Sequence, residues 1–268
     1  MAKVNLTKAL SDEYLDLFNT CVIDPGTAAQ VEGIVDKLLS HQQRYETVAN
    51  EVNIPWYFIA VIHNMESSQS FTRHLHNGDP LTARTKHVPE NRPKEGEPPF
   101  TWEESAEDAL RYEKLHLWSQ WHIAGLLYKI EGYNGWGYRL YHAHVKSPYL
   151  WGYSNHYASG KYVADGTWSD TAVSKQCGAA VILRRLCERG VIQIPEADIP
   201  RPIATAINNE KPILVYSARS QKPYAKELQE FLNQFPGVYL KPDGWPGKKT
   251  SDAFKKVTGY YLSGDPRI

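Results

Sequence analysis

The segment from Pro55 to Glu66 constrains the fold more than any other part of this chain. It reads Pro-Trp-Tyr-Phe-Ile-Ala-Val-Ile-His-Asn-Met-Glu, which has the length of a helix and is apolar on most sides. Proline is tolerated in the first turn of a helix, and a helix without a polar face has to be covered by other elements. The segment therefore predicts a buried central helix that ends in a carboxyl group, Glu66.

The rest of the first 190 residues predicts a mainly helical domain around this central helix. Thr101 and Glu104 have the spacing of a capping box, which marks the start of one helix. Residues 70–100 carry many prolines and an Asn77-Gly78 pair, so they predict a small hairpin followed by a long irregular loop. The apolar periodicity predicts further helices at residues 7–19, 28–40, 41–51, 121–130 and 169–189.

A proline-rich stretch divides the chain. Residues 193–203 hold three prolines in eleven positions, which is typical of an extended linker. Residues 205–268 carry ten Lys and Arg against six Asp and Glu, although the whole chain is balanced at 30 and 30. We expect a catalytic domain over residues 1–190, a linker over 191–215 and a small basic domain over 216–268.

The charge balance and the termini limit the function classes. A protein that wraps nucleic acid normally has a clear basic excess, so nucleic acid is not an expected partner. No apolar run approaches the roughly 18 residues of a membrane span, and the first residues lack the apolar stretch of a signal peptide. Cys21, Cys177 and Cys187 are too few for a disulfide framework. We expect synthesis in the cytoplasm without a signal peptide.

Glu66 is the first candidate catalytic group. A carboxyl at the end of an apolar helix loses hydration of its charged form, which raises its pKa. A glutamic acid that keeps its proton near neutral pH can donate it to a glycosidic oxygen. The alternative is a solvated surface carboxylate, which is common at helix ends.

Two segments carry a resemblance to a known family. Glu66-Ser67 closes an apolar helix, and residues 131–138 read Glu-Gly-Tyr-Asn-Gly-Trp-Gly-Tyr. Both resemble the lysozyme superfamily, especially goose-type lysozymes and soluble lytic transglycosylases, over residues 55–139. The resemblance implies a lysozyme-like α+β domain with a small hairpin, which cuts the glycan of peptidoglycan with Glu66 as the acid. The Gly-Leu-Met-Gln element of the transglycosylases is absent, so hydrolysis and transglycosylation both stay open.

A second carboxylate would complete a hydrolase. Asp79 follows Glu66 by thirteen residues on the predicted hairpin, which suits a base that holds a water about 6.5–9.5 Å from the acid. Its place before Pro80 is equally typical of a turn. Asp79 is thus a candidate base, and Thr82 and Thr85 are candidates for orienting the water. Weaker rivals for the base are Glu90, Glu103 and Glu104.

The chain is rich in aromatic residues with a polar edge. Its 8 Trp and 17 Tyr suit sugar rings as well as protein packing. Ser67, next to the candidate acid, is one candidate for substrate contact. The other candidates, each with packing as its alternative, are Tyr133, Asn134, Tyr138, Tyr149, Trp151 and Tyr153.

Histidines allow a different interpretation of the same region. His63, His74, His76 and Asp79 are residue types that bind zinc, as a metal-dependent amidase or peptidase would require. However, the chain has no His-Glu-x-x-His and no other complete zinc-hydrolase signature. We expect no metal and no cofactor, and we interpret these histidines as the polar lining of a cleft.

Residues 216–264 carry the most specific pattern of the chain. A short amphipathic segment is followed by Lys-Pro-Asp-Gly-Trp-Pro-Gly at residues 241–247, in which Asp243-Gly244 predicts a tight turn. The pattern strongly resembles the three-helix peptidoglycan-binding module of many cell-wall hydrolases. That resemblance implies attachment to the wall, with Asp243 and Trp245 as candidate contacts.

These features together predict a modular peptidoglycan hydrolase that resembles a phage endolysin. We expect an N-acetylmuramidase that acts on the bacterial wall after release from the cytoplasm, as a monomer whose partner is peptidoglycan. The alternatives are a metal-dependent amidase or peptidase, a non-catalytic wall-binding protein, a lytic transglycosylase and a chitinase-like enzyme, since a fold does not fix its substrate.

Overall fold

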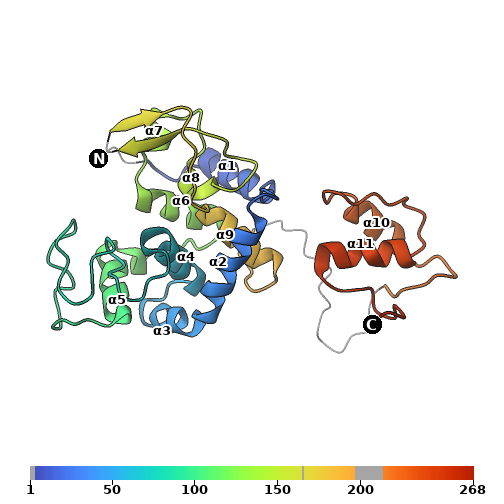
Figure 1. Ribbon diagram of the computed structural model, residues 1–268, viewed down its shortest axis with the longest axis horizontal. Coiled ribbons are helices and arrows are strands. Elements are labelled where there is room, and N and C mark those ends of the chain that lie inside the picture. The colour runs from blue at the N-terminus through green and yellow to red at the C-terminus, as the bar shows by residue number, and fades with distance from the viewer. Residues whose placement is uncertain (1–3, 165, 197–213) are drawn as a thin grey trace. The chain divides into compact units, whose positions relative to one another are not determined.

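The computed structural model describes residues 4–164, 166–196 and 214–268 (Figure 1). The chain divides into two compact units, residues 1–199 and 200–268. This boundary falls inside the segment predicted as a linker, residues 191–215, of which 197–213 lie outside the described residues. The described residues form eleven α-helices and one two-stranded antiparallel sheet, so the prediction of a mainly helical protein is confirmed.

Local sequence signals place most helices of the first unit. The described helices are α1 Lys8–Asn19, α2 Ala28–Ser40, α3 Gln42–Val52, α4 Trp56–Ser67, α5 Trp102–Tyr112, the 3-10 helix η1 Leu115–Leu117, α6 Ile123–Asn134, α7 Gly137–Tyr141, α8 Pro148–Trp151 and α9 Ala179–Glu188. The capping box of α5 is confirmed: Glu104 Oε2 accepts a hydrogen bond from the Thr101 N–H at 2.7 Å, and Thr101 Oγ1 accepts one from the Glu104 N–H at 3.2 Å.

The helix α4 is the buried centre of the first unit, as its composition predicts. Its eight consecutive residues Phe58–Met65 are buried, and α3, α6 and α9 contact it (Figure 1). Complete burial of one large apolar side chain contributes about 1.5–3 kcal/mol, so this run fixes α4 in place. The helix ends where Ser68 adopts a left-handed conformation with φ 52°, which leaves Glu66 in the last turn. No helix in the described part of the chain is long and apolar enough to cross a membrane.

The hairpin predicted around Asn77-Gly78 forms only in part, without regular strands. An isolated antiparallel bridge joins Arg73 and Pro80, and the His74 N–H donates to the carbonyl of Asp79 at 2.7 Å. Proline has no N–H to donate to a ladder, and Asn77 Oδ1 instead accepts a hydrogen bond from the Asp79 N–H at 3.0 Å, which closes a tight turn. The sheet lies later in the chain, where β1 (Lys161–Ala164) pairs with β2 (Thr167–Ser169).

Two other helices differ from their predicted lengths. The helix predicted at residues 121–130 is α6, which continues through Glu131 to Asn134. The helix predicted at residues 169–189 is α9, which begins only at Ala179. The backbone at Gly178 approaches α8 so closely that an added Cβ would lie 2.2 Å from the carbonyl oxygen of Leu150. This contact starts α9 late and leaves the preceding residues as a loop.

The second unit has two helices among residues 214–268, α10 (Ala225–Leu232) and α11 (Lys248–Thr258), so the prediction of three helices is wrong. Leu228 and Phe254 belong to its apolar core. The buried amide of Gln229 holds the loop between the helices: its Nε2 donates to Asp243 Oδ1 at 2.9 Å, and its Oε1 accepts from the Gly244 N–H at 2.8 Å.

Candidate active site

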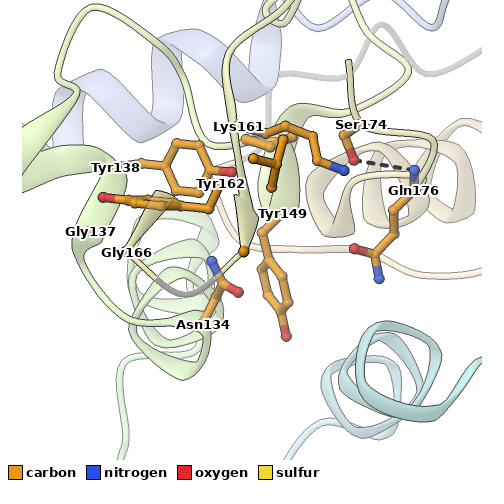
Figure 2. A pocket seen from close by; sticks show the side chains of 12 residues that line it. Asn134, Gly137, Tyr138, Tyr149, Lys161, Tyr162, Gly166, Ser174 and Gln176 are labelled. Carbon is orange, nitrogen blue, oxygen red and sulfur yellow. Dashed lines mark hydrogen bonds between the residues drawn. The ribbon is translucent and has the colours of Figure 1, made fainter. Parts of the chain in front are cut away.

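Glu66 is in contact with the wall of a cavity in the first unit. The cavity has a volume of about 520 Å³ and is lined by residues of α6, α7 and α8, by β1 and by the loop before α9. The hydroxyl of Tyr149, which lines it, donates a hydrogen bond to Glu66 Oε1 at 2.7 Å. Gln176, on the same wall, donates to the carbonyl of Met65 at 3.0 Å. Figure 2 shows the hydroxyl of Tyr149 pointing away from Tyr162. The end of α4 is therefore tied to the cavity at two places.

Burial changes the acidity of the groups at this position. Burial raises the pKa of Glu66, and the hydrogen bond from Tyr149 partly offsets the rise because it favours the charged carboxylate. Burial, followed by the negative charge of Glu66, raises the pKa values of Tyr149 and Tyr133. Both phenols therefore stay protonated as donors. A carboxyl group of this kind keeps its proton to a higher pH than a surface glutamate, as a general acid requires.

We expect the variant Tyr149→Phe to shift the pH dependence of any reaction that needs protonated Glu66. The variant lacks the hydrogen bond that favours the carboxylate, so the pKa of Glu66 rises further. Because a general acid acts below its pKa, the alkaline limb of the pH–rate profile should move to higher pH. The measurement is the pH profile of the expected activity, cleavage of purified cell wall, for wild type and variant, with the exposed Tyr112→Phe as control. A shift to lower pH contradicts this account of Glu66.

The carboxylate of Asp79 has a structural role, because its hydrogen bonds hold the loop that follows it. Its Oδ2 accepts hydrogen bonds from the N–H groups of Lys86 at 2.7 Å and His87 at 3.0 Å, and His87 Nδ1 lies 2.6 Å from Oδ1. Burial opposes ionisation, but these hydrogen bonds outweigh it and lower the pKa of Asp79 to about 2. A Cβ added to Gly78 would lie 3.7 Å from the carbonyl oxygen of Glu66, so this turn packs against the end of α4. The role of Asp79 as a base stays a prediction, and such an acidic group is a weak one.

Two of the three hydroxyl residues predicted near the acid are hydrogen-bonded to backbone carbonyls. Ser67 donates to the carbonyl of His63 at 3.2 Å. Thr85 is buried and donates to the carbonyl of Pro89 at 2.5 Å, which shapes the loop, whereas Thr82 is exposed. Their contacts with water or substrate stay predictions.

The structure brings together some of the predicted substrate-binding residues. Asn134, Tyr138 and Tyr149 line the cavity (Figure 2). Tyr133 lies beside them in α6, close enough for the charge of Glu66 to affect its phenol. Trp151 is 1% exposed and belongs to the hydrophobic core, which corrects the prediction that its ring contacts substrate.

Sequence reasoning missed a further part of the cavity wall. Lys161 and Tyr162 come from β1, and Ser174 and Gln176 come from the loop before α9. Ser174 Oγ accepts a hydrogen bond from the Gln176 N–H at 3.3 Å (Figure 2). The stretch between α8 and β2 is rich in glycine and tyrosine, and this was the available signal for a binding surface. A single sequence does not show which distant segment such a stretch contacts.

The rival carboxylates occupy different surroundings. Glu103 pairs with Arg44 through two hydrogen bonds of 2.6 and 2.9 Å. Glu104 completes the capping box of α5, and Glu90 is exposed in the loop before that helix.

The histidines support the loop between α4 and α5. His74 Nδ1 lies 2.8 Å from Ser105 Oγ and its Nε2 lies 2.8 Å from the carbonyl oxygen of Ala83, so both ring nitrogens are engaged. His76 Nε2 lies 2.8 Å from a carboxylate oxygen of Asp108. Within the described ranges, no group of three or more His, Cys, Asp or Glu side chains is arranged to hold a metal ion. These contacts explain the two histidines as structural residues.

The candidate wall contacts of the second unit differ in exposure. Asp243 Oδ1 accepts hydrogen bonds from the Trp245 N–H at 3.0 Å and from Gln229, and these two bonds lower the pKa of Asp243. The indole of Trp245 is 43% exposed and is open to a ligand. Asp243 therefore shapes the turn that presents Trp245, and the contact with the wall stays a prediction.

The described residues thus define a mainly helical protein with a partly buried acid beside a polar and aromatic cavity. Comparison of the chain with family models, with curated proteins and with solved structures finds no match.

Proposed function

We propose that this chain cuts the glycan strand of peptidoglycan with Glu66 as general acid. The observation that carries the proposal is the 2.7 Å hydrogen bond between Glu66 and Tyr149, which places a carboxyl of raised pKa against the wall of a cavity of about 520 Å³. The resemblance of Glu66-Ser67 and residues 131–138 to the lysozyme superfamily supports the same function.

In the proposed reaction Glu66 transfers its proton to the glycosidic oxygen while the bond from that oxygen to C1 of the sugar breaks. The bonding electron pair stays on the leaving oxygen, which departs as a hydroxyl group. Water then adds to C1 and gives up a proton to the solvent, from which Glu66 regains the proton it donated, so one water is consumed for each bond cut. The amide groups of Asn134 and Gln176 can bind acetamido and hydroxyl groups, and the rings of Tyr138 and Tyr162 can pack on sugar faces.

Lytic transglycosylation is a second candidate, which the contacts of Asp79 favour. Both oxygens of its carboxylate are engaged by Lys86 and His87, and no other base has been assigned. In a transglycosylase the C6 hydroxyl of the cut sugar attacks its own C1 and forms an anhydro ring, and its proton passes to the carboxylate left on Glu66, so no water and no second carboxylate are needed.

The second unit is proposed as a wall-binding module. Its exposed Trp245 and the basic balance of the C-terminal residues suit an anionic, sugar-containing polymer. Attachment of one unit to the wall would raise the local concentration of glycan for the other.

The test is mass spectrometry of purified peptidoglycan digested by the wild type and by Glu66→Gln. We expect new glycan ends from the wild type and almost none from the variant. Reducing muramic ends identify a hydrolase, and anhydro ends identify a transglycosylase. Free stem peptides that appear equally with both proteins would overturn the proposal and favour an amidase or peptidase.

A further inference from the structure

A second, smaller cavity lies beside α6 in the first unit. Its volume is about 160 Å³, and its lining includes Glu113, which follows α5, and Tyr128, Lys129, Gly132 and Tyr133 of α6. None of these residues has a role in the reaction proposed above. The chemistry of these residues is therefore unexplained by that function.

One wall of this cavity is aromatic. The ring of Tyr128 lies between two indoles, with centroid distances of 5.8 Å to Trp118 and 5.0 Å to Trp136. Trp136 can pack against α6 because residue 132 is glycine: an added Cβ would lie 3.0 Å from its Cζ2 atom. The wall therefore depends on the absence of a side chain at Gly132.

The cavity also contains one charge of each sign. Partial desolvation raises the pKa of Glu113 and lowers that of Lys129, and the charge of each group opposes the shift of the other. The Lys129 side chain is half-buried, whereas Glu113 is exposed. The ammonium of Lys129 lies 4.2 Å from the ring centroid of Trp118. Among the described residues, neither side chain forms a hydrogen bond or a salt bridge. Both charges thus keep their bonding capacity for a ligand.

Tyr133 connects the small cavity with the candidate acid. After burial, the negative charges of Glu66 and Glu113 are the two causes that raise its pKa, so both carboxylates lie within electrostatic reach of one phenol. The next residue, Asn134, lines the large cavity. Tyr133 and Asn134 are consecutive residues of α6, so the two cavities adjoin the same end of this helix.

We propose that the small cavity binds a group carrying both an ammonium and a carboxylate, namely the diamino-acid end of a peptidoglycan stem peptide. A neutral sugar would cover the half-buried Lys129 and part of Glu113 without giving either charge a direct hydrogen-bonded partner, which is unfavourable. A zwitterionic group would pair both, and its aliphatic part would pack on Tyr128 and Trp136. This inference rests on the proposed function, and it makes peptide-bearing wall glycan the substrate in preference to chitin.

The direct test is calorimetric titration of the full chain with the tripeptide L-alanyl-γ-D-glutamyl-meso-diaminopimelic acid. The double variant Glu113→Gln/Lys129→Met removes both charges and leaves the net charge unchanged. We expect it to bind the tripeptide about tenfold more weakly than the wild type, as the loss of two partly exposed ion pairs implies. Gly132→Ala, which moves Trp136, should also weaken binding. A tripeptide with alanine in place of the diamino acid should bind the wild type about as weakly as the double variant binds the full tripeptide.

Equal binding of the tripeptide by wild type and double variant, or no binding by the wild type, would overturn the inference. Cleavage assays on glycan strands with and without stem peptides then test the peptide site and the proposed function separately. If neither strand is cut but the tripeptide binds with the expected variant effects, the proposed function fails and the site stands. If both strands are cut equally fast and the tripeptide does not bind, the site fails and the proposed function stands.

Discussion

The rate of glycan cleavage should fall by at least about a hundredfold in Glu66→Gln, because positioned general acids contribute about 10²- to 10⁴-fold. The substitution keeps the size of the side chain, and its amide oxygen can still accept the hydrogen bond from Tyr149. What it removes is the proton that Glu66 would give to the leaving oxygen. The measurement is the initial rate of release of new glycan ends from purified peptidoglycan, with wild type and variant at equal concentration.

The control for this prediction is Glu95→Gln, which removes one negative charge from an exposed position in the loop before α5. Its cleavage rate should match that of the wild type. A Glu66→Gln protein that sediments with the wall as the wild type does, but cuts it no slower, would show that Glu66 is not the acid. Loss of both binding and cleavage would instead indicate a folding defect, which the thermal midpoint of the variant detects.

The same variant has an expected effect on stability with a definite sign. Because burial raises the pKa of Glu66, the folded protein holds its proton more tightly than the unfolded chain does. The free energy of unfolding therefore falls as pH rises from the ordinary pKa of a glutamate through the raised value. Glutamine does not ionise, so Glu66→Gln should be at least as stable as the wild type at neutral pH. A site that gains stability when its acid is removed is typical of a functional position.

The predictable parts of the site depend on interactions between residues that lie close together in the sequence. The helix α4 is recognisable because its apolar residues continue around all sides, and that same pattern places Glu66 at its end. The capping box of α5 is recognisable because Thr101 and Glu104 satisfy each other's backbone groups within one turn. In both cases the residues that interact lie a few positions apart, so their spacing in the sequence reveals the interaction.

The partners of Glu66 could not be paired with it from the sequence. Tyr149 is 83 positions from Glu66, and Gln176 is 111 positions from Met65, whose carbonyl it contacts. Tyr149 was selected as an aromatic candidate, but nothing in its neighbourhood in the sequence indicates that it meets a carboxyl. Such pairs follow from the packing of α8 and α9 around the core, which depends on long-range contacts.

Residue type alone could not decide between a functional and a structural role at two positions. Trp151 has the flat face that a sugar needs, but the same face packs equally well in a core, where it lies. Asp79 has the type and approximate position of a base, but its carboxylate is held by Lys86 and His87. Burial and hydrogen-bond partners decide between these roles, and neither is visible in a one-dimensional pattern.

The largest effect on stability is expected from Arg139→Met. The carboxylate of Glu131 is 3% exposed and accepts hydrogen bonds from the Tyr14 hydroxyl and from Arg139, whose Nη2 lies 2.9 Å from its Oε2. Arg139 also contacts Glu13 at 3.1 Å, so the network joins α1, α6 and α7. Methionine keeps the aliphatic stem but leaves the charge of Glu131 without a cation. Breaking one side of a buried pair costs about 3 kcal/mol of unfolding free energy, which urea denaturation of the first unit measures.

Two further variants separate the charge effect from lost packing. Arg189→Met breaks surface pairs with Glu32 and Asp36 and should cost less than about 1 kcal/mol, since exposed pairs contribute little. Adding Glu131→Gln to Arg139→Met should recover part of the lost stability, because the buried group is then neutral and can still bond to Tyr14. If the double variant is no more stable than Arg139→Met, the loss comes from the packing of the arginine stem and not from an unpaired charge. Because Glu131 precedes Tyr133 and Asn134 in the same helix, the network also fixes the end of α6 that lines both cavities.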